Sequence, residues 1–166
     1  MAAPFHQIVV PTDFSPDADR AILAASELSR LYAAPLTIIH VYDPVAFPLP
    51  DGYMMYTSAQ LSEMWEEFER RLAQARRDAL AAGALGAQTR LLQGLTAAEI
   101  VRFAKDEGYD LIVMGTHGRH GVARVLLGSV AARVVQTAEC PVLTVRRRAQ
   151  RAEAALHEAA AAGTAA

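Results

Sequence analysis

Short apolar runs alternate with segments of helical periodicity along most of the chain. The runs are rich in β-branched and aliphatic residues and end in turn-forming residues, which is typical of buried strands in a parallel sheet. They cover residues 7–13, 36–41, 87–92, 110–114 and 141–145. Apolar residues recur at helical spacing between them, over about 16–32, 58–82, 97–107 and 129–137. This alternation predicts an α/β fold, with a doubly wound parallel five-stranded sheet and helices on both faces.

Start signals precede the expected helices. Ser15 and Pro16 supply an N-cap and a proline at the first helical position. Thr57 and Thr96 are each followed three residues later by Gln or Glu, so we expect both threonines to cap their helices in capping boxes. Residues 43–56 carry three prolines and a glycine, and we expect a long connection without a helix or strand there.

Length and composition favour one domain. A chain of 166 residues is long enough for a single core, and we assign residues 1–146 to it. Residues 147–166 are rich in alanine, so we expect a frayed helix or a disordered tail. The net charge of −2 gives no attraction to nucleic acid or to an anionic membrane, and no apolar run approaches membrane-spanning length. The single cysteine, Cys140, favours a reducing, cytoplasmic setting.

Three connections are candidates for a ligand site. Ligands of doubly wound sheets bind beyond the carboxyl ends of the strands, where the strand order reverses. Thr12 and Asp13 follow the first run, Val41 closes the second, and a glycine-punctuated loop follows the run 110–114. We expect these three connections to form the site together.

The glycine-punctuated loop runs from Gly115 to Ser129, with Gly118 and Gly128 between them. Glycines let the main chain approach a ligand closely, and amide groups at a helix start favour an anion, so we interpret the loop as a phosphate cradle. It matches neither the Walker A pattern nor the dinucleotide fingerprint. The alternative is a strand-to-helix connection with glycines for its turns and Ser129 as a cap, and the spacing alone leaves both open.

Four motifs occur in order between residues 5 and 146: Val10-Pro-Thr-Asp-Phe-Ser15, Ile39-His-Val41, Gly115-x2-Gly118-x9-Gly128-Ser129 and Cys140-Pro-Val-Leu-Thr-Val145. Together they resemble the universal stress protein family, in its ATP-binding branch. The resemblance implies a sheet of order 3-2-1-4-5 and a homodimer paired through the last strand. It also implies ATP bound across the strand ends.

The resemblance further implies which residues bind the nucleotide. Those for the adenosine part are Asp13 and the backbone of Val41, beside Pro11 and Thr12. Those for ribose and phosphates are Gly115, Gly118, Gly128, Ser129 and the amide of Val130. We add Met114, at the strand end, and Arg119, which could neutralise phosphate charge. ATP would bring Mg²⁺ with it, and we assign no catalytic residue and no protein metal site. For Asp13 the alternative is a charge that favours the start of the first helix.

The leading functional hypothesis is an ATP-binding universal stress protein, a regulatory or signalling protein whose state depends on bound nucleotide. One alternative is a slow ATP-hydrolysing or phosphotransfer enzyme. Against it, we find no candidate general base beyond Asp13 and no lysine in the glycine-punctuated loop. The other alternative is a dimeric interaction module with an empty pocket.

Overall fold

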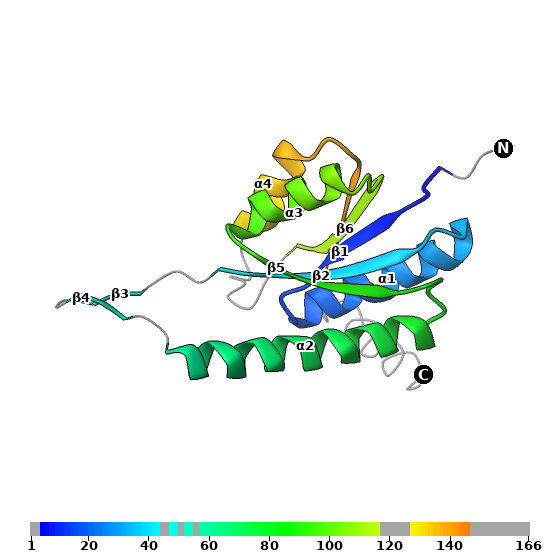
Figure 1. Ribbon diagram of the computed structural model, residues 1–166. Coiled ribbons are helices and arrows are strands. Elements are labelled where there is room, and N and C mark those ends of the chain that lie inside the picture. The colour runs from blue at the N-terminus through cyan, green and yellow to red at the C-terminus, as the bar shows by residue number, and fades with distance from the viewer. Residues whose placement is uncertain (1–3, 44–46, 50–51, 55–56, 117–126, 147–166) are drawn as a thin grey trace, which may run out of the picture.

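The computed structural model describes residues 4–43, 47–49, 52–54, 57–116 and 127–146, and all structural statements below refer to these residues. Its elements follow one another as Figure 1 shows. They are β1 (Ile8–Pro11), α1 (Pro16–Tyr32), β2 (Leu36–Tyr42), β3 (Phe47–Leu49), β4 (Gly52–Met54), α2 (Ser58–Ala81), β5 (Gln88–Gln93), α3 (Thr96–Asp106), β6 (Leu111–Gly115), α4 (Ser129–Thr137) and β7 (Val142–Val145).

Five of the strands form one parallel sheet in the order β5-β2-β1-β6-β7. Numbered by their place among these five, the order is 3-2-1-4-5, so the predicted topology is confirmed. Ile8 of β1 lies opposite Leu36 of β2 on one side and Leu111 of β6 on the other. The first strand therefore occupies the centre of the sheet, and β5 and β7 form its edges.

Helices cover both faces of the sheet, α1 and α2 on one and α3 and α4 on the other (Figure 1). The side chains of each inner strand alternate between two hydrophobic cores. In β1, Ile8 and Val10 pack with residues of α1 and α2, whereas Val9 packs with residues of α3 and α4. Because both faces are buried, the central strands need continuous apolar runs, which is the pattern that the sequence carries.

Helix starts follow the sequence signals in two of three cases. The Ser15 hydroxyl accepts a hydrogen bond from the Ala18 N–H, and Thr57 forms the expected capping box with Gln60. The prediction for Thr96 was wrong, because the helix begins one residue earlier than a threonine cap requires. The N-cap is Leu95, and no side chain caps α3.

The segment 43–56 also departs from expectation, since it contains the antiparallel pair β3 and β4. Pro48 lies opposite Tyr53 within this hairpin. Each strand of a two-stranded ribbon has one unpaired edge, and proline is tolerated at such edges. Proline content alone was therefore a poor argument against a strand here.

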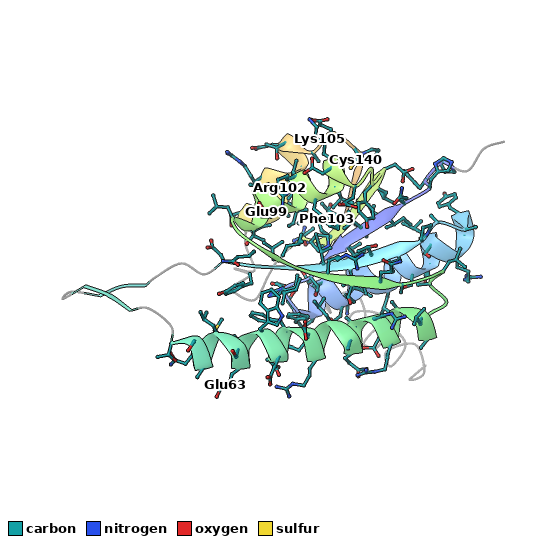
Figure 2. The ribbon with its side chains drawn as sticks, viewed as in Figure 1. Glu63, Glu99, Arg102, Phe103, Lys105 and Cys140 are labelled. Atoms are coloured by element: carbon teal, nitrogen blue, oxygen red, sulfur yellow. The ribbon has the colours of Figure 1, made fainter. Side chains whose placement is uncertain are left out.

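The apolar stripe of α2 is only partly buried. Leu72 and Ala79, in the carboxyl-terminal half, lie in the core, whereas Leu61 is exposed and Trp65 is 40% exposed. Glu63 projects from α2 away from the sheet (Figure 2). The amino-terminal half of α2 therefore contributes little to the core. The predicted tail, 147–166, lies outside the described residues.

Candidate functional site

The connection after β1 is held by a set of hydrogen bonds centred on Thr12. Pro11 ends the strand, and the Thr12 N–H continues the ladder by donating to the Ile39 carbonyl at 2.8 Å. The Thr12 hydroxyl oxygen accepts the Phe14 N–H at 2.9 Å, and the Thr12 carbonyl accepts a bond from Nδ1 of His40 at 2.7 Å. Thr12 is only 5% exposed, so the wall role predicted for it would fall mainly to its backbone.

Phe14 turns this connection sharply toward α1. Its φ is +61°, a left-handed conformation that costs a non-glycine residue on the order of 1 kcal/mol. The ring packs between other groups: its centroid is 4.6 Å from that of His40, and the Arg71 guanidinium carbon lies 4.5 Å from it. These contacts and the hydrogen bond from the Phe14 N–H to the Thr12 hydroxyl stabilise the strained turn.

Asp13 lies at the apex of the turn and is half-buried. Its Oδ1 accepts the Ser15 N–H at 3.1 Å, just before the first turn of α1. This bond supports the alternative interpretation, in which Asp13 helps to begin the helix. It does not oppose the ligand role, because a carboxylate accepts several hydrogen bonds at once.

Val41 presents its backbone to the same edge. The Ile39 carbonyl faces β1, where it accepts the Thr12 N–H, whereas the Tyr42 carbonyl faces the other side and accepts the Gly94 N–H. Backbone groups of successive strand residues alternate between the two neighbouring strands, so the N–H and C=O of Val41 point to the β1 side. They lie beyond Pro11, the last residue of β1. A planar ligand with one donor and one acceptor could pair there.

Gly115, at the end of β6, is constrained by packing. A Cβ at this position would lie 2.9 Å from the Asp17 carbonyl carbon and 3.1 Å from the Ala18 nitrogen, both in the first turn of α1. Its neighbour Met114 is buried in the core on the α3 and α4 face. Both residues therefore have structural roles that account for their identity without a ligand.

The start of α4 has the features of an anion site. Gly128 is the N-cap and has no side chain with which to cap the helix, and its N–H donates to the Thr116 carbonyl at 2.7 Å. That bond holds the helix start directly beside the end of β6. The first-turn amides, those of Ser129 and Val130 among them, have no partner inside the helix, and such amides attract anions. Gly128 has φ −65°, which any residue adopts, so its backbone conformation does not require glycine.

The ends of β1, β2 and β6 are neighbours in the sheet, so the predicted residues from these strands and from the start of α4 lie along one edge. Gly118 and Arg119 lie outside the described residues, as do His117 and His120. No group of three or more His, Cys, Asp or Glu side chains that could hold a metal ion occurs within the described part of the chain.

Comparison with known proteins gives the family. The family model for universal stress proteins matches residues 4–146. The chain belongs to the universal stress protein family. The universal stress protein MJ0531 of Methanocaldococcus jannaschii is 37% identical over 145 residues, which cover 86% of this chain and 83% of that relative.

Two solved universal stress proteins that resemble this chain are nucleotide complexes. One is bound to cAMP; it is 28% identical with a TM-score of 0.67, over 86% of this chain and 97% of that one. The other, from Archaeoglobus fulgidus, is bound to dAMP; it is 25% identical with a TM-score of 0.61, over 87% of this chain and 99% of that one. Both ligands contain adenine and a phosphate group.

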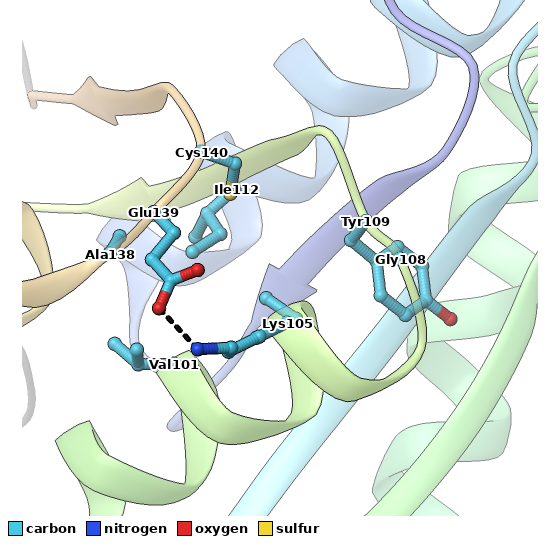
Figure 3. A pocket seen from close by; sticks show the side chains of 9 residues that line it. Val101, Lys105, Gly108, Tyr109, Ile112, Ala138, Glu139 and Cys140 are labelled. Carbon is cyan, nitrogen blue, oxygen red and sulfur yellow. Dashed lines mark hydrogen bonds and ion pairs between the residues drawn. The ribbon is translucent and has the colours of Figure 1, made fainter.

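This universal stress protein has a cleft at the opposite edge of the sheet, where β6 and β7 begin (Figure 3). Its volume is about 210 Å³, and Lys105 of α3 pairs across it with Glu139 at 2.5 Å. Burial raises the pKa of the Cys140 thiol, which also lines it, so this cysteine has little thiolate character near neutral pH. The volume is below the usual 300 Å³ or more of ligand pockets.

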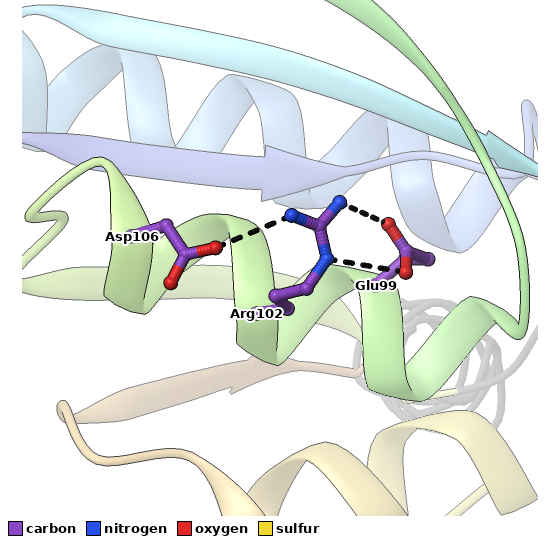
Figure 4. Close-up of polar contacts among 3 residues, drawn as sticks. All are labelled: Glu99, Arg102 and Asp106. Atoms are coloured by element: carbon purple, nitrogen blue, oxygen red, sulfur yellow. Dashed lines mark hydrogen bonds and ion pairs between the residues drawn. The ribbon is translucent and has the colours of Figure 1, made fainter.

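The most evident charge network lies on the surface of α3 (Figure 4). Arg102 pairs with Glu99 at 2.6 Å and with Asp106 at 3.2 Å, and the hydrogen bond from Arg102 lowers the pKa of the Glu99 carboxyl. These residues are three and four positions apart, the spacing of stabilising pairs on a helix. We therefore assign the network to helix stability.

The roles of His40 and Phe14 at the carboxyl edge of the sheet were not predicted from the sequence. From the sequence, His40 is interpreted as a packed side chain, and its bond to Thr12 has no local signal. The left-handed Phe14 was also missed, because an aromatic residue rarely adopts positive φ. The one available signal was a histidine inside an otherwise buried strand, since a buried imidazole requires a hydrogen-bond partner.

Proposed function

We propose that this universal stress protein binds an adenine nucleotide, ATP with Mg²⁺, at the carboxyl edge of its sheet. The start of α4 is the observation that carries the proposal. The N-cap residue, Gly128, offers no side chain to the first amides, and the hydrogen bond from its N–H to the Thr116 carbonyl holds them beside the strand ends. Ser129 and Val130 would donate their N–H groups to phosphate oxygens.

The adenosine end of the proposed site lies between β1 and β2. Val41 would pair through its backbone with the adenine edge, and the Asp13 carboxylate would accept from ribose or base. Pro11 and Thr12 would form the wall beside them. The relatives bound to cAMP and dAMP support an adenine ligand. Gly118 and Arg119 belong to this proposal as residues of the phosphate end.

Gly115 and Met114 have a different place in the proposal. Gly115 lets β6 end against the first turn of α1, and Met114 packs in the core on the α3 and α4 face. They would shape the floor of the site through packing. Mg²⁺ would be held mainly by phosphate oxygens and water, as it commonly is in nucleotide sites.

The activity that fits this site is regulation through bound nucleotide in a stress response. The groups that face the ligand in the proposal are backbone amides, the Asp13 carboxylate and the Arg119 guanidinium. They bind and orient, and the glycine-punctuated loop contains no lysine to stabilise a leaving phosphate. We therefore propose a nucleotide-dependent regulator, and not an efficient ATPase.

A homodimer through β7 and a cytoplasmic location complete the proposal. β7 is an edge strand, and its Leu143 is 41% exposed. Unpaired strand edges invite pairing with a second chain. The free thiol of Cys140 is in keeping with a reducing compartment.

Gly128→Val tests the nucleotide site, because it places a branched side chain where phosphate would lie. Isothermal titration with Mg-ATP should detect binding to the wild-type protein and none to this variant. Val135→Ala, on the exposed side of the same helix, is the control and should bind as the wild type does. ATP at a hundredfold excess over its Kd should also stabilise the wild type by about 2.7 kcal/mol. Equal affinity in Gly128→Val would contradict the proposed phosphate site.

A further inference from the structure

His40 is a buried polar group next to the proposed nucleotide site. It lies in β2 on the face covered by α1 and α2, and it is only 8% exposed. Its ring centroid is 4.6 Å from that of Phe14 and 4.6 Å from that of Phe68. An imidazole among aromatic rings is costly to bury unless its nitrogens are hydrogen-bonded.

The bond from His40 to Thr12 fixes the state of the imidazole. Its Nδ1 lies 2.7 Å from the Thr12 carbonyl oxygen. A carbonyl can only accept a hydrogen bond, so Nδ1 carries the proton. The bond joins residues 28 positions apart, from the second strand to the turn after the first.

This bond also orients the next peptide group. No peptide bond in the described residues is cis, and in a trans peptide the C=O and the following N–H point in opposite directions. With the Thr12 carbonyl directed at His40, on the α1 and α2 face, the Asp13 N–H is directed to the other side. The hydrogen bond from the Thr12 N–H to Ile39 and the one that the Thr12 hydroxyl accepts from the Phe14 N–H hold the residue in this orientation.

We propose that His40 is a positioning residue of the nucleotide site: it holds the Thr12–Asp13 peptide so that the amide and carboxylate of Asp13 face the ligand. This inference rests on the proposed function. His40 would then affect nucleotide affinity without contacting the ligand itself. The competing explanation is that His40 only fills space between Phe14 and Phe68.

Substitutions that change the hydrogen-bond donor and the side-chain volume separately can distinguish these explanations. His40→Asn keeps an amide N–H near the position of Nδ1 but loses ring volume. His40→Phe keeps the ring volume and loses the donor. Positioning requires His40→Asn to bind Mg-ATP within about twofold of the wild type and His40→Phe to bind about five- to tenfold more weakly, the effect of one hydrogen bond. Space filling requires the reverse order, because the smaller side chain would then be the more damaging.

His40→Gln provides a second comparison, in case His40→Phe does not fold. Its amide extends toward the position of Nε2, away from the Thr12 carbonyl, so positioning requires it to bind more weakly than His40→Asn. Titration calorimetry gives the affinities, and the Asp13 amide resonance of the nucleotide-free protein should move in His40→Phe and not in His40→Asn.

The outcomes separate the two proposals. If the wild type does not bind Mg-ATP, the proposed function fails and this inference fails with it. If the wild type binds and His40→Phe or His40→Gln binds equally well, the nucleotide site stands and only the positioning role is overturned.

Discussion

Gly115→Ala should destabilise the fold whether or not a nucleotide is present. The new Cβ would lie 2.9 Å from the Asp17 carbonyl carbon and 3.1 Å from the Ala18 nitrogen, where ordinary contacts are 3.4–4 Å. Both atoms belong to the backbone of the first turn of α1, which Ser15 caps, so neither can rotate away. Either β6 or α1 has to shift by a few tenths of an ångström.

Overpacking of this kind costs about 1–3 kcal/mol, and for a protein of this size it should lower Tm by about 2–12 °C. Differential scanning calorimetry of the nucleotide-free protein measures the shift. Gly128→Ala is the matched control: its φ of −65° suits alanine, and loss of a glycine N-cap costs less than about 1 kcal/mol. A Tm for Gly115→Ala equal to that of the wild type, or higher than that of Gly128→Ala, would refute the packing argument.

Two further predictions concern the chain start and the sheet edge. Burial raises the pKa of Asp110, but bonds from the backbone N–H groups of Gln7 and His6 and from the His6 ring outweigh it and lower this pKa below 3.8. The Asp110 carboxylate therefore stabilises the fold above its pKa in the unfolded chain, and this stabilisation is lost as the pH falls through its lower pKa in the folded protein. Asp110→Asn should lower the free energy of unfolding by about 1 kcal/mol at neutral pH, and progressively less below about pH 4, as measured by thermal unfolding. A difference in stability between wild type and variant that stays constant from neutral to acid pH would contradict this prediction. Leu143→Glu should convert the proposed β7 dimer into a monomer in analytical ultracentrifugation, whereas Leu31→Glu, at an exposed position of α1, should not. A wild type that sediments only as a monomer at high concentration would disprove that dimer.

The fold class was predictable because it follows from periodicity, whereas the strand order 3-2-1-4-5 was implied by the resemblance to the family. Buried parallel strands need continuous apolar runs, and 36–41 and 110–114 have no other favourable place than the inside of a two-faced sheet. The helix start at Ser15 was predictable because capping is a local interaction between residues three apart. Thr96 carries the same signal, yet α3 begins at a different residue, where the chain leaves β5. Local capping energy there is too small to decide the boundary against the packing of the sheet.

The candidate site was predictable only as a set of loops. The motif residues identify the edge, and the structure brings Thr12, Val41 and Gly128 to it. The geometry inside the turn was not accessible, because it depends on contacts between distant parts of the chain. The left-handed Phe14 is stabilised by His40 and Arg71, which lie in β2 and α2. No pattern within residues 10–15 could have revealed those partners.

The tight fit of Gly115 against α1 has a consequence for how sequences in this family diverge. A relative that had lost its nucleotide would still need glycine at this position, because folding alone selects it. Gly128 has a φ of −65°, which any residue adopts, so its backbone conformation would not keep glycine at this position in the same relative. If the proposed nucleotide site is correct, a glycine at the position of Gly128 reports selection for a ligand, whereas a glycine at the position of Gly115 reports only that the sheet and its first helix are still in contact.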